Sequence, residues 1–363
     1  MPASDVAHSP LRRPRLTSGL GAETDSYSAS PRFRCRFGPP TLKPMLAPPA
    51  PPILLDDLID DLDAVVDLFE RSAPHTPLGG WFRPDRDGGE ATSPMWFQTD
   101  WVHADFAVEG ADLFFRNERV IEAARAFCDA EVVVPHTVYV NLMAAIAECG
   151  PAHTDNPVFR GRNRTNTPML LLRTMLWSGL FDRWVTPQVT SIWWLNDVEG
   201  GGFSYWPEGP EKPPQRHAGA MANTALVGDN HRMFHQVEPV GPFDARTRLV
   251  SASAELAPAK DGSGDWVVTE RGQESHRARF DRFRASVLWK ADVYPGEAGR
   301  RQVEQDLLSL EDVARIFDED LDRRGADLRF DLERLNDPAL VLGAIYPEPA
   351  PVGAAVSMFD VHR

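Results

Sequence analysis

The chain has 363 residues, of which 42% are hydrophobic and 25% charged, values typical of a globular protein with a substantial core. Its net charge is −15 without a basic stripe, which argues against nucleic acid or an anionic membrane surface as a partner. No apolar run reaches the roughly 18 residues that a membrane span needs. The three cysteines are widely spaced, which disfavours a disulfide framework and a thiolate metal site and indicates a reducing, cytoplasmic setting. Only four of the 38 basic residues are lysines, a skew typical of GC-rich bacterial genomes.

Residues 1–52 differ in composition from the rest of the chain. They are rich in Pro, Ser and Arg, have no sustained apolar period and end in LAPPAPP. This composition predicts a disordered tail or linker. An alternative is that residues 1–44 are upstream sequence and that Met45 is the native start.

Residues 53–363 are expected to form a single domain, with a helical part at 53–130 followed by a strand-rich core at 131–295. In the first part, apolar residues recur at helical spacing over 54–69, and a second helix is predicted over 117–127. Strand-like runs follow at 131–134 and 137–145. The apolar stretch at 167–184 predicts a buried helix.

From residue 189 onward, β-branched and aromatic runs alternate with Gly and Pro turns. The segment 296–363 is expected to be helical, because Ser309 and Asp312 form a capping box for a helix that runs through Asp322 and stops at Gly325. Helices, then many short strands, then a helix favour an antiparallel β-barrel or sandwich flanked by helices. The predicted strand runs are VTSIWWLND, GGGFSYWP, RMFHQVEPV, TRLVSASAEL, DWVVTER and RASVLWKADVY.

The candidate chemistry begins at CGPAHTDNPVFRG, where His153 and Asp155 follow a strand-like run. Alone, this stretch is equally well a polar turn without chemistry. A second imidazole, His235, lies in the strand-like run RMFHQVEPV. Two imidazoles and one carboxylate on one face of a metal leave the opposite positions open for co-substrate and O₂, as non-haem Fe(II) requires. The sequence therefore predicts a metal site at His153, Asp155 and His235.

A candidate anion clamp follows in RASVLWKADVY. Arg284 and Ser286 fall on the same face of this strand. A guanidinium binds a carboxylate through two hydrogen bonds, and a hydroxyl two residues on can add a third.

With these elements the sequence resembles the Fe(II)- and 2-oxoglutarate-dependent dioxygenases over residues 130–290. The matching motifs are His153-x-Asp155, the segment 195–201, His235-x-Val-x-x-Val and Arg284-x-Ser286. The resemblance implies a double-stranded β-helix (jelly-roll) core, Fe(II) on the two histidines and Asp155, and 2-oxoglutarate bound to the metal and to an arginine. It also implies O₂-dependent release of CO₂ and succinate with attack on a C–H bond.

One feature departs from the family pattern. The clamping arginine usually follows the distal histidine after a short interval, whereas Arg284 lies 49 residues after His235. Arg248 fits the interval but lacks the following Ser. We prefer Arg284, with a hairpin insertion over 246–280, and keep Arg248 as the alternative. Tyr139 and Asn141 are further candidates for contact with 2-oxoglutarate.

The predicted activity is an oxygenase, most simply a hydroxylase of an amino-acid-like or natural-product small molecule. Two alternatives remain at this point: a cupin-like metalloenzyme that does not use 2-oxoglutarate, and a non-catalytic jelly-roll binding protein. The expected partners are a small-molecule substrate and O₂. Substrate determinants are expected on the loops at 156–168 and 207–222 and in the N-terminal helices.

Overall fold

A computed structural model of the chain describes residues 50–83, 89–103, 105–242, 247–332 and 342–358. The chain divides into two units, Met1–Lys43 and Pro44–Arg363, and all described residues belong to the second. The tail predicted at 1–52 therefore lies outside the described residues except at its last three positions. Helices long and apolar enough to cross a bilayer are absent from the described part of the chain.

The larger of two main sheets has eight strands in the order β1-β10-β7-β16-β6-β4-β2, with β5 paired to β4. All of its pairings are antiparallel. Its centre is the long pair of β6 and β16, which pair along the whole of β16 with one register shift between Lys290 and Ala291. The strands are β1 (Ile53–Asp56), β2 (Thr76–Pro77), β4 (Trp96–His103), β5 (Phe106–Ala107), β6 (Val132–Met143), β7 (Gln188–Trp194), β10 (Thr224–Gly228) and β16 (Arg284–Tyr294).

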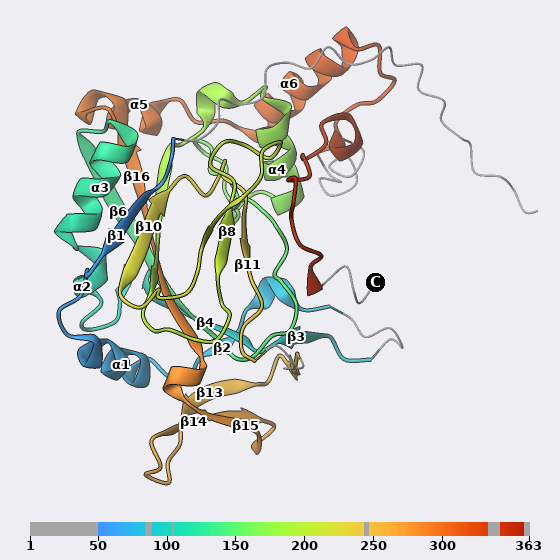
Figure 1. Cartoon of the computed structure of the whole chain (residues 1–363). Coiled ribbons are helices and arrows are strands. Elements are labelled where there is room, and N and C mark those ends of the chain that lie inside the picture. The colour runs from blue at the N-terminus through green and yellow to red at the C-terminus, as the bar shows by residue number, and fades with distance from the viewer. Residues whose placement is uncertain (1–49, 84–88, 104, 243–246, 333–341, 359–363) are drawn as a thin grey trace, which may run out of the picture. The chain divides into compact units, whose positions relative to one another are not determined.

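The smaller sheet has the order β11-β8-β9 and consists of β8 (Phe203–Tyr205), β9 (Gln215–His217) and β11 (His235–Val237). The segment 146–153 extends it, because Ile146 bridges Val240 and His153 bridges His235. From β6 to β16 the chain crosses repeatedly between the two sheets, which is the connectivity of a jelly roll. The predicted double-stranded β-helix is thus confirmed, as two facing sheets (Figure 1).

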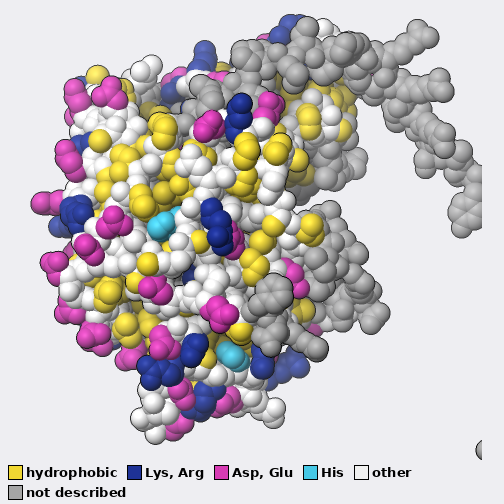
Figure 2. Space-filling model, in the orientation of Figure 1, with side chains coloured by type: hydrophobic (Ala, Val, Ile, Leu, Met, Phe, Trp, Pro, Cys, Tyr) yellow, Lys and Arg dark blue, Asp and Glu magenta, His cyan; other side chains and the backbone are white. Residues whose placement is uncertain are grey.

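Helices cover the outer face of the larger sheet. These are α1 (Leu62–Arg71), α2 (Asp112–Phe115) and α3 (Glu118–Cys128), the last of which confirms the helix predicted over 117–127. The outward side chains of β6 and β16, such as Val138, Val140, Val287 and Trp289, pack with these helices in one apolar cluster. Charged side chains remain on the solvent side, and acidic ones are spread along the edge that α2 and α3 form (Figure 2).

A second apolar core joins α4 (Met169–Ser178) and the 3₁₀ turn η2 (Asp182–Trp184) to α6 (Leu310–Arg323). The predicted buried helix over 167–184 is therefore a shorter helix followed by this turn. The predicted capping box on α6 is present: Asp312 N donates to Ser309 Oγ at 3.0 Å, and Ser309 N donates to Asp312 Oδ2 at 3.3 Å. Helix α5 (Glu297–Gln305) precedes it.

The helix predicted over 54–69 is wrong at its start. Residues 53–56 form strand β1, which pairs with β10, and the helix begins only after the N-cap Asp61. Asp57 lies at φ +50°, in a left-handed conformation that a continuous helix excludes. The free edge of β10 offers backbone hydrogen bonds, and this tertiary pairing overrides the helical periodicity of ILLDDLI.

A separate three-stranded sheet lies between β11 and β16 in the chain, at residues 255–279. It is made of β13 (Glu255–Pro258), β14 (Asp265–Glu270) and β15 (Gln273–Arg279) and projects from one end of the molecule (Figure 1). This sheet occupies most of the 246–280 interval that was expected to be a hairpin insertion. The remaining elements are β3 (Thr92–Pro94), which pairs with β12 (Leu249–Ser251), and the 3₁₀ turns η1 (Gly79–Trp81) and η3 (Phe280–Arg282).

Candidate metal centre

The fold brings His153, Asp155 and His235 together at one end of the space between the two sheets. His153 and His235 face each other across an antiparallel bridge, with N···O distances of 3.0 and 2.9 Å in the two directions. The Asp155 backbone N–H donates to the Asn230 carbonyl at 2.8 Å, which fixes the carboxylate on the same side. One ligand atom from each of the three residues lies within 4.8 Å of the other two.

The backbone fixes the tautomer of both imidazoles. Nδ1 of His153 lies 2.9 Å from the Pro151 carbonyl, and Nδ1 of His235 lies 3.1 Å from the Met233 carbonyl. Because a carbonyl oxygen only accepts, each Nδ1 carries the hydrogen and donates it. Nε2 of each ring is therefore left with a free lone pair, which is the form that binds a metal.

The protonation states of the three residues suit a cation. Burial lowers the pKa of His153 to about 4, and the neighbouring His235 adds to this effect. Burial also lowers the pKa of His235. Burial acts to raise the pKa of Asp155, but Lys290 and the surrounding imidazoles outweigh it and hold that pKa well below its usual value. At neutral pH the site therefore presents two neutral imidazoles and one carboxylate.

Lys290 was missed by sequence reasoning and contacts the centre directly. Its Nζ lies 2.7 Å from Asp155 Oδ2, and the two side chains are 17% and 15% exposed. The other carboxylate oxygen, Oδ1, lies 3.7 Å from His235 Nε2. Lys290 therefore holds one oxygen of Asp155 and leaves the other turned toward the histidines. The available signal was strand parity, because Arg284, Ser286 and Lys290 alternate on one face of β16.

The four residues predicted to contact 2-oxoglutarate, apart from Arg248, share the inner face of the larger sheet. Ser286 of β16 stands opposite Asn141 of β6 in the register, and Tyr139 stands opposite Leu288. The alternate residues of both strands point into the helix-covered core, so these side chains point between the sheets. Arg284 is 3% exposed and Ser286 1%.

The buried polar atoms on this inner face that have no hydrogen-bond partner among the described residues include Nη2 of Arg284 and Oδ1 of Asn141. Such atoms are rare in proteins and indicate a place where a polar ligand binds. Arg284 is held by its Nε, which donates to the Gly201 carbonyl at 2.7 Å. A Cβ at Gly201 would lie 3.0 Å from Arg284 Cδ, so this approach requires glycine. Burial lowers the pKa of Arg284 to about 10, which still leaves it charged.

Arg248, the alternative clamp, lies elsewhere. Its side chain is exposed, and its Nη1 is 3.5 Å from the Ser275 carbonyl of β15. The structure therefore brings Arg284, and not Arg248, to the inner face. Trp193, Trp194 and Trp206 are each 1% exposed and pack in the core.

A pocket of about 1560 Å³ opens in front of the three residues and includes His153 and Asp155 in its wall. The expected loop at 156–168 contributes Asn156 and Arg164, whereas the loop at 207–222 contributes nothing to the wall. Another part of the wall comes from the segment 348–358, which we call the C-terminal strap. Because the strap is far from His153 and Asp155 in the sequence, no local motif predicted that it lines the pocket.

The strap is tied to the strand that carries His235. The Gln236 side chain donates to the Ala355 carbonyl at 2.9 Å and accepts from the Ala355 N–H at 3.0 Å, and it also donates to the Gly150 carbonyl at 2.8 Å. Farther along, the Met358 N–H donates to the Cys149 carbonyl at 2.9 Å. Consecutive residues of β11 thus serve the candidate metal centre and the strap.

No family model and no curated protein matches this chain. Among solved structures, it is similar to a 2OG-Fe(II) oxygenase family oxidoreductase from Burkholderia pseudomallei, at 12% identity and a TM-score of 0.36, over 68% of this chain and 86% of that one. It is similar to the carbocyclase SnoK of nogalamycin biosynthesis at 11% identity and a TM-score of 0.36, over 69% and 85%. It is also similar to HygX from Streptomyces hygroscopicus, solved with nickel, 2-oxoglutarate and hygromycin B, at 9% identity and a TM-score of 0.33, over 67% and 83%.

These similarities are distant, so the assignment rests on the strand order and on the residues of the site. The two facing sheets have the jelly-roll connectivity, and His153, Asp155 and His235 converge at one end of the space between them. In fold, the chain resembles the Fe(II)- and 2-oxoglutarate-dependent oxygenases.

Proposed function

We propose that this protein is a non-haem Fe(II)- and 2-oxoglutarate-dependent oxygenase that hydroxylates a small molecule and releases succinate and CO₂. The observation that carries the proposal is the convergence of three ligand atoms within 4.8 Å at the mouth of a large pocket. Two histidines and one carboxylate are the ligand set that leaves open positions on iron.

Each group has a candidate partner in the chain. His153, Asp155 and His235 would hold the iron, while Arg284 and Ser286, with Tyr139 and Asn141 beside them, would hold 2-oxoglutarate. When bound, the metal and co-substrate supply the oxidising chemistry that O₂ activation requires.

The chain itself contributes orientation and charge. The backbone carbonyls of Pro151 and Met233 keep the two imidazoles in the tautomer that binds metal. Lys290 fixes one oxygen of Asp155 and balances its negative charge before a metal arrives. Burial keeps water away from the inner face, so a carboxylate meeting the Arg284 guanidinium there is bound more strongly than in solvent.

The inward guanidinium also bears on the alternatives. Burying a charged arginine without a counter-ion costs free energy. An anionic co-substrate that binds the arginine would offset this cost, whereas a metalloenzyme without a co-substrate would not. The unpaired Nη2 of Arg284 therefore favours a 2-oxoglutarate-dependent enzyme over a cupin-like enzyme without co-substrate.

The direct test is anaerobic addition of Fe(II) and 2-oxoglutarate to the full-length protein. We expect the weak visible charge-transfer band of the metal-bound 2-oxo acid, followed by succinate formation when O₂ is admitted. His153→Ala and His235→Ala should each abolish both signals. A protein that folds but gives neither band nor succinate would contradict the proposal.

A second comparison identifies the clamp. Arg284→Ala should weaken 2-oxoglutarate binding by at least about 30-fold, because a desolvated charge-assisted pair is lost. Arg248→Ala should leave binding unchanged. If only the Arg248 variant weakens binding, the clamp is Arg248.

A further inference from the structure

The pocket in front of the candidate metal centre carries a charge imbalance that the proposed iron and 2-oxoglutarate do not use. Its charged lining residues are Arg83, Asp155, Arg164, Arg173 and Glu348. Three are cations, in a chain whose net charge is −15. The cations outnumber the two anions among these lining residues, so the pocket favours a ligand with a negative charge.

Most of these charges are already satisfied. Asp155 is bound by Lys290. Arg173 faces Glu348 of the C-terminal strap through two hydrogen bonds, of which Nε to Oε2 measures 3.0 Å. Arg83 donates to the carbonyls of Gly80 and Phe82 at 3.1 and 2.8 Å.

Arg164 is different, since it has no hydrogen bond or ion pair to any described residue. The same pocket wall includes His153 and Asp155 of the candidate metal centre. The Arg164 side chain is therefore exposed and shares a pocket with the candidate metal centre.

The backbone on either side of Arg164 is held in place. Asn163 Oδ1 accepts from the Thr165 N–H at 2.9 Å, and Asn166 Oδ1 accepts from the Asn163 N–H at 3.0 Å. Asn166 Nδ2 in turn donates to the Gly161 carbonyl at 3.1 Å. A turn closed on itself in this way presents the arginine with little loss of backbone freedom when a ligand binds.

The rest of the wall is largely apolar. Trp81, Met169, Phe234 and Met358 line it, and the Trp81 ring stands edge-on to His153 with centroids 6.5 Å apart. A ligand that fits this wall has an apolar body, and among the described lining residues Arg164 is the cation left available for a charged group. A single guanidinium matches a planar carboxylate through paired hydrogen bonds.

We propose that the substrate of this pocket is an apolar molecule with one carboxylate, which Arg164 binds beside the candidate metal centre. This inference rests on the proposed function for the reaction that follows, but the binding step is independent of it. Glu348 occupies the Arg173 guanidinium, so Arg173 does not bind the substrate. The strap therefore limits the number of anionic groups that the pocket binds.

The test uses a matched pair of probes, phenylacetate and the neutral phenylacetamide, titrated calorimetrically into the full-length protein at low salt. Titrations are made with the metal-free protein and with protein that holds Zn(II) and 2-oxoglutarate. We expect the carboxylate to bind about fivefold more tightly than the amide. Arg164→Gln should remove this preference, while Arg277→Gln, the same change far from the pocket, should keep it.

A gain of binding provides the second arm. Glu348→Gln frees Arg173 and should increase the preference for phenylacetate by about another fivefold. Equal binding of the two probes to the unaltered protein, or a preference that survives Arg164→Gln, would overturn the inference.

The two proposals fail separately. If the chain shows no charge-transfer band but discriminates the probes through Arg164, the oxygenase assignment is wrong and the carboxylate site stands. If the band appears without discrimination, the reverse holds.

Discussion

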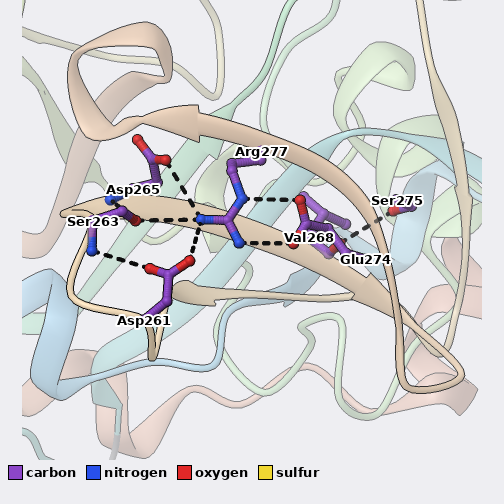
Figure 3. Close-up of polar contacts among 7 residues, drawn as sticks. All are labelled: Asp261, Ser263, Asp265, Val268, Glu274, Ser275 and Arg277. Atoms are coloured by element: carbon purple, nitrogen blue, oxygen red, sulfur yellow. Dashed lines mark hydrogen bonds and ion pairs between the residues drawn. The ribbon is translucent and has the colours of Figure 1, made fainter.

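Two regions of the molecule are organised around a basic side chain, and they differ in how much solvent reaches it. In the candidate metal centre, Lys290 and Asp155 form a single pair whose side chains are 17% and 15% exposed. On the projecting sheet, Arg277 bonds Asp261 at 2.9 Å and Glu274 at 2.8 Å, and those two carboxylates are 52% and 46% exposed (Figure 3).

The exposed cluster around Arg277 thus has more polar contacts than the Lys290–Asp155 pair, although each contact in it contributes less to stability. Arg277 also reaches Asp265 at 3.5 Å and Ser263 at 3.3 Å. In solvent, water and salt replace such contacts readily, so the cluster adds little stability. The pair in the candidate metal centre is less exposed, so solvent screens it less and the loss of one partner costs more.

Breaking the buried pair should have the largest effect. In the metal-free protein, Lys290→Met leaves Asp155 buried without its cation and should lower the free energy of unfolding by about 3–5 kcal/mol. Urea denaturation measures this loss, and added Zn(II) should recover part of it because the metal also binds Asp155. An unchanged unfolding midpoint in the metal-free variant would show that solvent screens the pair.

An intermediate effect is expected at His75, where the projecting sheet meets α1 and β4. His75 is fully buried, stacks on Trp266 of β14 and has Nε2 3.1 Å from the Phe69 carbonyl. Burial lowers its pKa from 6.5 to about 4, so the folded protein favours the neutral ring. Its contribution, on the order of 3 kcal/mol, is complete above pH 6.5 and is lost as the pH falls toward 4.

The measurement is the difference in unfolding free energy between the unaltered protein and His75→Gln across that pH range. The difference should shrink as the pH falls, because only the unaltered protein loses the histidine contribution. A difference that is independent of pH would mean that His75 titrates normally.

The smallest effect belongs to the exposed cluster. Arg277→Gln should leave the urea midpoint within experimental scatter, and the small remaining difference should vanish at 1 M salt, where the Debye length is about 3 Å. A loss as large as that of Lys290→Met would erase the distinction between the two regions.

The sequence predicted those parts of the site that depend on short motifs or on the alternation of residues along one strand. His153-x-Asp155 and the strand around His235 carry their own spacing, and Arg284 shares strand parity with Ser286. Lys290 could have been found by extending the same parity by four residues.

The remaining parts depend on tertiary contacts. The C-terminal strap lies about 200 residues after His153 in the chain, and it is held by Arg173, by Gln236 and by backbone hydrogen bonds, all from residues far away in the sequence. Strand β1 has a helical apolar period and becomes a strand only because β10 offers it an edge. Whether such a segment becomes a strand or a helix depends on which strand edges the rest of the fold leaves without a hydrogen-bonding partner.

The position of Gln236 has a practical consequence for any engineered form of the protein. Its amide replaces a strand partner for Ala355, one residue from His235 on a strand of only three residues. A fusion tag or a cut placed near residue 355 would therefore pull on the same short strand that sets the position of an expected ligand. Immobilisation or labelling through the opposite terminus avoids that mechanical link.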